Sequence, residues 1–237
     1  MNTNLNTNPK AVLITGASGR IGFELAEQCI ELGYHVILHY RSSPQPAQSF
    51  FKDDSRVTFL QAELTESPEK FVEDVFKLPL TLEGLINSAS VFQTGNMSDP
   101  NHFQSVMSVN VMVPLRLAAE FAKYVKNGWI LNITDAHTKP KSKNYQNYRV
   151  SKMFLDEITR QLAFLYAPAI RVNAIAPGAI LPAAGGSAGK FDVLAKNIPL
   201  GKTGNVGYIR QTFRFLVEND YITGCVIPVD GGWHLCG

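Results

Sequence analysis

The chain is poor in cysteine, in net charge and in long hydrophobic runs. Its 3 cysteines, Cys29, Cys225 and Cys236, are scattered and lack the spacing of metal ligands. We therefore expect reduced thiols, no metal site and a cytoplasmic protein. A formal net charge of +2 gives no strong attraction to nucleic acid or to an acidic membrane surface. No apolar run approaches the roughly 20 residues of a membrane span, so no membrane partner is expected.

The N-terminus also lacks the apolar core of an export signal. Residues 1–8 are rich in Asn and Thr, and the sequence predicts a disordered tail over residues 1–9 and no export. The remaining residues, 10–237, suit one globular domain, because 45% of the chain is hydrophobic and 18% is charged.

Short apolar runs alternate with helical patterns along this domain. The predicted strands are residues 11–15, 34–40, 57–60, 84–87, 129–134, 170–175 and 226–229. The predicted helices are residues 23–32, 68–77, 103–126, 153–166 and 206–218. Such alternation predicts a single α/β domain: a doubly wound parallel sheet with helices on both faces.

A glycine-rich turn lies between the first predicted strand and the first predicted helix. This is the context of a dinucleotide-binding turn, because glycines let the backbone approach the pyrophosphate and a helix N-terminus offers free N–H groups. A tight connection without a ligand is the alternative interpretation. The residues predicted to bind the cofactor here are Gly16, Ser18, Arg20, Ile21 and Gly22.

The end of the second predicted strand has no carboxylate. NAD enzymes usually place an acid there for the ribose hydroxyls. This chain has His39-Tyr40 followed by Arg41-Ser42-Ser43, and a guanidinium with two hydroxyls suits a 2′-phosphate. The pattern predicts NADPH rather than NADH, with all five residues near the cofactor; a solvated loop is the alternative.

A small polar turn follows the fourth predicted strand. Asn87, Ser88, Ala89 and Ser90 would stand at the carboxyl edge of the sheet, where ligands of such folds bind, and are predicted to contact the cofactor. Phe92 comes next. An aromatic side chain at this place is either packing or a surface on which a flat heterocyclic substrate stacks.

A tyrosine and a lysine four residues apart, Tyr148 and Lys152, share one helical face. A fixed ammonium favours the phenolate, so Lys152 is expected to lower the pKa of Tyr148 from its ordinary value of about 10. A surface Tyr along a Lys stem is the alternative. Asn110, inside an apolar run, is either a structural hydrogen-bonding group or part of the site. Residues 179–200 are expected to form a mobile segment over the substrate.

Six short motifs follow one another in a fixed order along the chain. They are Thr15-Gly16-x-x-x-x-Ile21-Gly22, Asn87-Ser88-Ala89, Asn110, Tyr148-x-x-x-Lys152, Pro177-Gly178 and Asp230-Gly231-Gly232. In order and spacing they resemble the short-chain dehydrogenase/reductase family along almost the whole chain. The resemblance implies a Rossmann-type sheet of about seven parallel strands, an NAD(P)(H) cofactor and a homotetramer. It also implies catalytic roles for Asn110, Tyr148 and Lys152, and cofactor contacts from Lys152, Pro177, Gly178 and Ile180.

Two departures from the family pattern narrow the resemblance. Arg20 replaces the usual middle glycine of the first turn, and Asp135 replaces the catalytic Ser, 13 positions before Tyr148. Together with Phe92 they resemble the pteridine reductase subfamily, especially its bacterial dihydromonapterin reductase branch. The resemblance implies that Glu63 contacts the adenine in the place of a usual Asp. It further implies that the substrate contacts Arg20, Ser90, Phe92, Asp135, Tyr148 and Leu181.

These residues lead us to expect NADPH-dependent reduction of a dihydropterin, either dihydromonapterin or dihydrobiopterin, with dihydrofolate as a further substrate. Pterin reduction adds a hydride to a ring carbon and a proton to a ring nitrogen, and an Asp linked to Tyr148 can relay that proton. One alternative is a carbonyl reductase acting on a 3-oxoacyl thioester or a sugar. The other is a non-catalytic NADPH-binding sensor.

Overall fold

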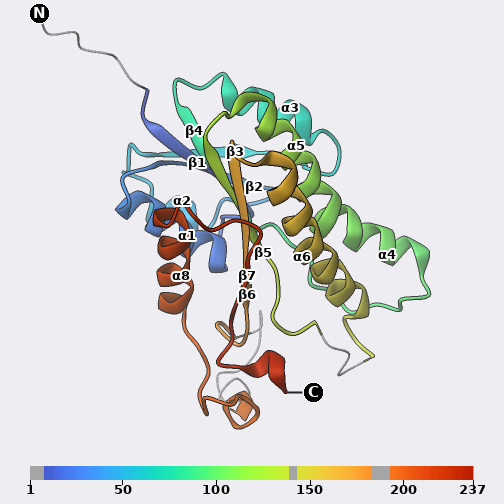
Figure 1. Ribbon diagram of the computed structural model, residues 1–237. Helices are drawn as coiled ribbons and strands as arrows, with labels where there is room; N and C mark the ends of the chain where they lie inside the picture. The colour runs from blue at the N-terminus through green and yellow to red at the C-terminus, as the bar shows by residue number, and fades with distance from the viewer. Residues whose placement is uncertain (1–7, 139–142, 183–192, 237) are drawn as a thin grey trace, which may run out of the picture.

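The computed structural model describes residues 8–138, 143–182 and 193–236, and within them seven strands form one parallel sheet (Figure 1). The strand order is β3-β2-β1-β4-β5-β6-β7. The strands are β1 (Lys10–Thr15), β2 (His35–Tyr40), β3 (Val57–Gln61), β4 (Thr81–Asn87), β5 (Gly128–Ile133), β6 (Ile170–Pro177) and β7 (Val226–Val229). The predicted doubly wound sheet is confirmed. Residues 1–7 of the predicted disordered tail lie outside the described residues.

Helices cover both faces of the sheet. The α-helices are α1 (Arg20–Glu31), α2 (Ala47–Phe50), α3 (Pro68–Phe76), α4 (Pro100–Met107), α5 (Val113–Tyr124), α6 (Gln146–Tyr166) and α8 (Val206–Glu218). A π-helical turn, η1 (Ser108–Met112), and two 3-10 turns, η2 (Ala195–Asn197) and η3 (Trp233–Leu235), complete the set. Helices α1 and α8 lie on one face, and α3, α5 and α6 lie on the other (Figure 1).

Strand β1 shows why the sheet is buried on both faces. Val12 and Ile14 belong to the hydrophobic cluster on the α1 and α8 side, whereas Ala11 and Leu13 belong to the cluster on the α3, α5 and α6 side. Successive strand side chains point to opposite faces, so a continuous apolar run fills both cores. The apolar run over residues 11–15 is therefore unbroken because its side chains fill the cores on both faces of the sheet.

The predicted helix over residues 103–126 is wrong at both ends and in the middle. It begins earlier, at Pro100, because the Asp99 carboxylate accepts hydrogen bonds from the backbone N–H groups of Asn101 (3.0 Å) and His102 (3.3 Å). The π-helical turn Ser108–Met112 then divides it into α4 and α5. Such turns insert one residue into a helix and often mark functional sites. Asn110 lies in this turn and is fully buried.

The combined stretch Pro100–Tyr124 is the one part of the described chain that is long and apolar enough to cross a membrane by length and composition. The expectation that no apolar run approaches the length of a membrane span is wrong by this measure. Half of its most apolar window is buried inside the protein. Leu117 and Phe121 of α5 pack in the core beside the sheet, as expected of a core helix.

A chain of buried amide and hydroxyl groups joins β4, β5 and α6. The Asn87 Nδ2 donates to Asn132 Oδ1 (2.9 Å), and Asn132 Nδ2 donates to Thr159 Oγ1 (2.9 Å). The Thr159 hydroxyl donates to the Leu155 carbonyl within α6 (2.7 Å). Because unpaired polar groups are costly in a core, this chain fixes the position of α6 relative to the two central strands.

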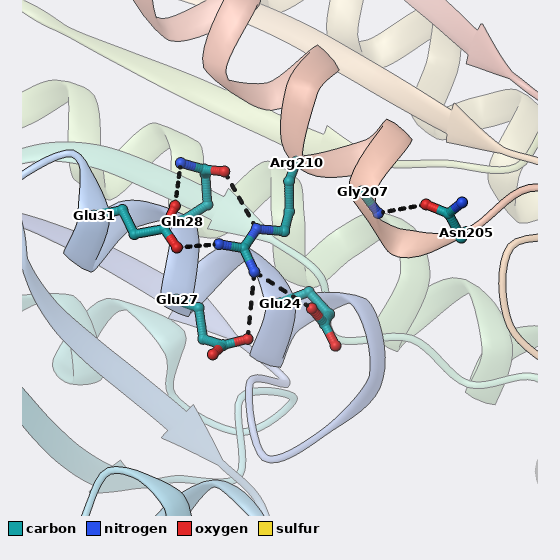
Figure 2. A network of polar contacts seen from close by, with 7 residues as sticks. All are labelled: Glu24, Glu27, Gln28, Glu31, Asn205, Gly207 and Arg210. Atoms are coloured by element: carbon teal, nitrogen blue, oxygen red, sulfur yellow. Dashed lines mark hydrogen bonds and ion pairs between the residues drawn. The ribbon is translucent and has the colours of Figure 1, made fainter.

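An arginine of α8 binds a row of acidic side chains on α1 (Figure 2). The Arg210 guanidinium lies 3.9 Å from the Glu24 carboxylate and 3.6 Å from that of Glu27, and it also pairs with Glu31. Its Nε donates to Gln28 Oε1 at 3.2 Å. The acids lie three and four residues apart, so they repel one another without the arginine. The bridge thereby holds α1, whose first turn borders the site.

We expect Arg210→Met to lower the free energy of unfolding by about 1 kcal/mol, since it removes the attraction and leaves the acids facing one another. Urea unfolding at low salt measures this loss, and added salt should shrink it. Arg214→Met is the matched control, because Arg214 of the same helix forms an ion pair with the exposed Glu218 (2.8 Å) and with no other acid in the described part of the chain. If Arg210→Met and Arg214→Met lost the same free energy of unfolding, the Arg210 network would contribute no more than a single surface ion pair.

Candidate active site

A cavity of ≈ 880 Å³ lies along the carboxyl ends of the strands. Its walls come from the segments that follow β1, β2, β3, β4, β5 and β6, from η1, α5 and α6, and from η3 near the C-terminus. In an open parallel sheet this edge is the expected place for a ligand. The predicted site residues that line it are Gly16, Ser18, Arg20, Ile21, His39, Tyr40, Arg41, Ser42, Ser43, Glu63, Ser88, Ala89, Ser90, Phe92, Asp135, Tyr148, Lys152, Pro177, Gly178, Ile180 and Leu181.

The turn after β1 passes close to the turn after β4. Gly16 has φ +64°, and a Cβ on it would lie 2.6 Å from the Ala89 Cα. Only glycine fits this approach. Gly19, the N-cap residue of α1, has no side chain to cap the first N–H groups of the helix. This helix start lines the cavity, and uncapped N–H groups at a helix N-terminus favour an anion.

Arg20 begins α1 in the left-handed conformation, with φ 59°. Its Nη2 donates to the Pro182 carbonyl at 3.2 Å, which links the first turn to the segment after β6. The positive charge of Arg20 also lowers the pKa of Tyr148 against larger opposing effects. Arg20 therefore acts both on the segment after β6 and on the Tyr148 phenol.

His39 and Glu63 line the cavity with their hydrogen-bonding groups engaged within the protein. The Gly16 N–H donates to His39 Nδ1 (3.3 Å), and His39 Nε2 lies 3.0 Å from the Ala62 carbonyl, so the ring links three strand ends. Burial lowers the pKa of His39, which keeps the ring neutral. Glu63 accepts hydrogen bonds from Thr65 N and Oγ1, and these bonds lower its pKa. Arg41, nearby, lowers it further.

The Tyr148 hydroxyl donates to the Asp135 carboxylate at 2.8 Å. The other oxygen of Asp135 accepts from the backbone N–H of His137 at 2.6 Å. Burial raises the pKa of Tyr148 well above its ordinary value, and the negative charge and hydrogen bond of Asp135 raise it further. The expectation that Lys152 lowers this pKa is wrong in this structure, because burial and the Asp135 carboxylate outweigh the one opposing charge, that of Arg20. Tyr148 keeps its proton at neutral pH.

Lys152 is buried one helical turn beyond Tyr148. Its ammonium donates to the Ile133 carbonyl at 2.8 Å and lies 5.6 Å from the centre of the Tyr148 ring. Burial lowers the pKa of Lys152 to about 8, although Asp135 and Asp156 oppose this shift. Asp156 was not among the predicted site residues; the signal for it is its spacing of four residues from Lys152 on α6.

Three predicted site residues stand behind the cavity rather than in its wall: Gly22, Asn87 and Asn110. Asn87 belongs to the buried amide chain. Asn110 accepts a hydrogen bond from Val91 N (2.8 Å) and donates to the Val91 carbonyl (3.0 Å) and to Ser151 Oγ (2.9 Å). It thus holds the loop after β4 against α6.

Further lining residues were not predicted as site residues. Two of them lie in or beside predicted features: Leu194 falls in the 179–200 segment, of which residues 183–192 lie outside the described residues, and Trp233 follows the Asp230-Gly231-Gly232 motif. The others include Gln45, Thr65, Val91, Val109, Val113, Thr134 and Ala179. Most are apolar or small, and such residues carry no chemical signature in a sequence.

Comparison with known proteins gives one family and full-length relatives. Residues 16–234 match a short-chain reductase family model described as "Enoyl-(Acyl carrier protein) reductase". Dihydromonapterin reductase of Shigella sonnei is 27% identical over 96% of this chain and 98% of its own length. An uncharacterized oxidoreductase, YmfI of Bacillus subtilis, is 26% identical over 95% and 99%. The crystal structure of FolM alternative dihydrofolate reductase 1 from Brucella suis, in complex with NADP, has a TM-score of 0.88, 30% identity and 96% coverage of both chains.

We expect Lys152→Met to stabilise the cofactor-free protein by roughly 1–3 kcal/mol at about pH 7, because it removes a charge that burial disfavours. The folded-state pKa of Lys152, about 8, lies below the unfolded value of about 10.4. The unfolded chain therefore binds more protons between these values, and this unfavourable contribution fades as pH rises through that window.

Urea unfolding at about pH 7 and about pH 9.5 tests this sign. The advantage of Lys152→Met over the wild type should shrink at the higher pH. Lys123→Met, at an exposed ammonium, is the control and should show no such trend. A variant less stable than the wild type at neutral pH would show that the hydrogen bond to Ile133 outweighs the burial of the charge.

Proposed function

The chain belongs to the short-chain dehydrogenase/reductase family, and from this premise we propose that it reduces a dihydropterin to the tetrahydro form with NADPH. The observation that carries the proposal is the Tyr148–Asp135 hydrogen bond (2.8 Å) beside the half-exposed ring of Phe92, all lining one cavity. A carboxylate on the tyrosine and an aromatic wall suit a flat, nitrogen-containing ring better than a simple ketone.

NADP(H) is the cofactor, and the residues present fit it. A Cβ at Gly16 or Gly22 would meet backbone atoms within 2.6–2.8 Å, so the turn has the close packing that a pyrophosphate site needs. Arg41, Ser42 and Ser43 line the cavity after β2 and would hold a 2′-phosphate. When bound, NADPH supplies a hydride. Lys152 would hold the nicotinamide ribose.

The proton has its source in Tyr148. Because burial and Asp135 raise its pKa, the phenol is protonated at neutral pH and can donate to a ring nitrogen of the substrate. Asp135 accepts the phenol proton in a hydrogen bond, and the His137 N–H fixes that carboxylate. The pair therefore holds a proton at the Tyr148 Oη and can relay it.

The names of the relatives agree with this substrate class: one is a dihydromonapterin reductase and another an alternative dihydrofolate reductase. Both are 30% identical or less, so the preferred pterin belongs to the proposal. The expected homotetramer and the cytoplasmic location stay predictions.

The test is NADPH oxidation with dihydromonapterin, dihydrobiopterin, dihydrofolate and a 3-oxoacyl thioester in parallel. Turnover that is strongest with a dihydropterin supports the proposal. Turnover of the thioester alone would replace it with the carbonyl reductase. No turnover with any of the four, despite NADPH binding, would favour the non-catalytic sensor.

Replacing Tyr148 with Phe should lower kcat about 10²–10⁴-fold, as expected for loss of a general acid. NADPH affinity, measured by nicotinamide fluorescence, should change little, since the ring stays in place. Tyr166→Phe, near the other end of α6, is the control. If Tyr148→Phe weakened NADPH binding as much as it slowed turnover, the assigned role would be wrong.

Replacing Arg41 with Ala should raise the KM for NADPH roughly 10–100-fold, the value of a charge-assisted hydrogen bond to phosphate. The KM for NADH should hardly change, because NADH has no 2′-phosphate. Lys52→Ala removes an exposed charge outside the cavity lining and serves as control. An equal effect on both nucleotides would assign Arg41 a general electrostatic role.

A further inference from the structure

Tyr145 stands just before α6, three residues from Tyr148, in a backbone conformation that disfavours its side chain. It has φ 60° and ψ 22°, the left-handed region. A non-glycine residue there costs roughly 1–2 kcal/mol, and glycine or asparagine are the usual occupants. Its carbonyl accepts the first helical hydrogen bond, from Arg149 N at 3.0 Å, which any residue could do. The hydrogen bond of its carbonyl therefore does not explain why residue 145 is a tyrosine.

The ring of Tyr145 stacks on that of Phe92. Their centroids lie 4.2 Å apart and their planes differ by 3°. Phe92 also contacts Tyr148 edge to face: their ring centroids lie 4.7 Å apart and their planes differ by 83°. Phe92 and Tyr148 line the cavity, and Tyr145 stands outside the lining. Tyr145 therefore covers one face of the Phe92 ring from outside the cavity lining.

Phe92 depends on such a contact for its orientation. Its loop is held at the preceding residue, Val91, by two hydrogen bonds to Asn110. The ring itself makes no hydrogen bond and remains 55% exposed. Packing alone can fix the plane of an exposed aromatic ring, and the ring contacts of Phe92 are the parallel Tyr145 and the edge-to-face Tyr148.

We propose that Tyr145 is a positioning residue, which fixes the ring of Phe92 as the aromatic wall of the cavity and so sets its preference for a flat bicyclic heterocycle. The identity of the substrate rests on the proposed function, whereas the contact between the two rings does not. The left-handed backbone is the cost of placing an aromatic ring at this point of the chain.

The first experiment compares Tyr145→Asn with Tyr145→Phe. Asparagine tolerates the left-handed region, so it removes the ring without adding backbone strain. We expect the KM for dihydromonapterin to rise roughly three- to tenfold in Tyr145→Asn, the value of one aromatic pair, with kcat and the KM for NADPH nearly unchanged. Tyr145→Phe keeps the ring and should therefore retain the wild-type KM. An unchanged KM in Tyr145→Asn would overturn the positioning role.

The matched control breaks a stacked pair elsewhere. Tyr124 stacks on Phe76 with centroids 4.4 Å apart at 26°, and neither ring lines the cavity. Tyr124→Asn should leave the KM for dihydromonapterin at its wild-type value. A rise equal to that of Tyr145→Asn would assign the effect to general loosening and overturn the proposal.

A second readout needs no turnover. Thermal unfolding of the wild type, Phe92→Ala, Tyr145→Asn and the double variant forms a double-mutant cycle. We expect the double variant to lose less Tm than the two single losses added, because each single change already breaks the stack. If the Tm loss of the double variant equals the sum of the two single losses, the proposed contact between the two rings is wrong.

The two readouts separate two kinds of failure. If the wild type reduces no dihydropterin, the proposed function fails and the substrate preference fails with it, while the cycle still decides the contact between the rings. If the wild type is active and the cycle shows coupling, the KM of Tyr145→Asn decides the positioning role alone.

Discussion

The position of α6 against the sheet is the constraint on which the site depends. The buried chain from Asn87 through Asn132 to Thr159 fixes that position, because none of its members can lose its partner cheaply in the core. Lys152 adds a second attachment to β5 through the Ile133 carbonyl. Since Tyr148 and Lys152 belong to the same helix, both reach the carboxyl edge of the sheet together. Asn110 then fixes the loop after β4 to this helix through Ser151.

Burial acts on the two central groups in opposite directions, toward their neutral forms. It raises the pKa of Tyr148 and lowers that of Lys152. Asp135 shifts both the same way, because a nearby negative charge disfavours phenolate and favours ammonium. A serine in this place could hydrogen-bond the phenol but could not supply that field. The carboxylate thus favours the protonated form of both groups, which suits the proposed role of Tyr148 as a proton donor.

The sequence alone predicted the sheet, the last helix and strand, and most of the cavity wall. Strand residues such as Val12 and Ile14 signal themselves through continuous apolarity, and Gly16 and Arg41 through their place after a strand. What failed depends on tertiary contacts. The spacing of Tyr148 and Lys152 places them on one face, but the direction of the pKa shift follows from burial. Likewise, an apolar helix pattern cannot show the π-helical turn at Asn110, because the inserted residue leaves the surrounding composition unchanged.

Backbone strain and a buried charge are concentrated at the site. Across the described ranges, the non-glycine residues with positive φ are Arg20 and Tyr145, and both border the cavity or its aromatic wall. Lys152 adds a buried ammonium whose lowered pKa records the cost of taking it out of water. Such features persist only where the surrounding structure over-determines them. Here the support lies outside the cavity lining, in the amide chain behind α6 and in the Arg210 bridge that fixes α1. The surrounding scaffold thus offsets the local cost of the site it carries.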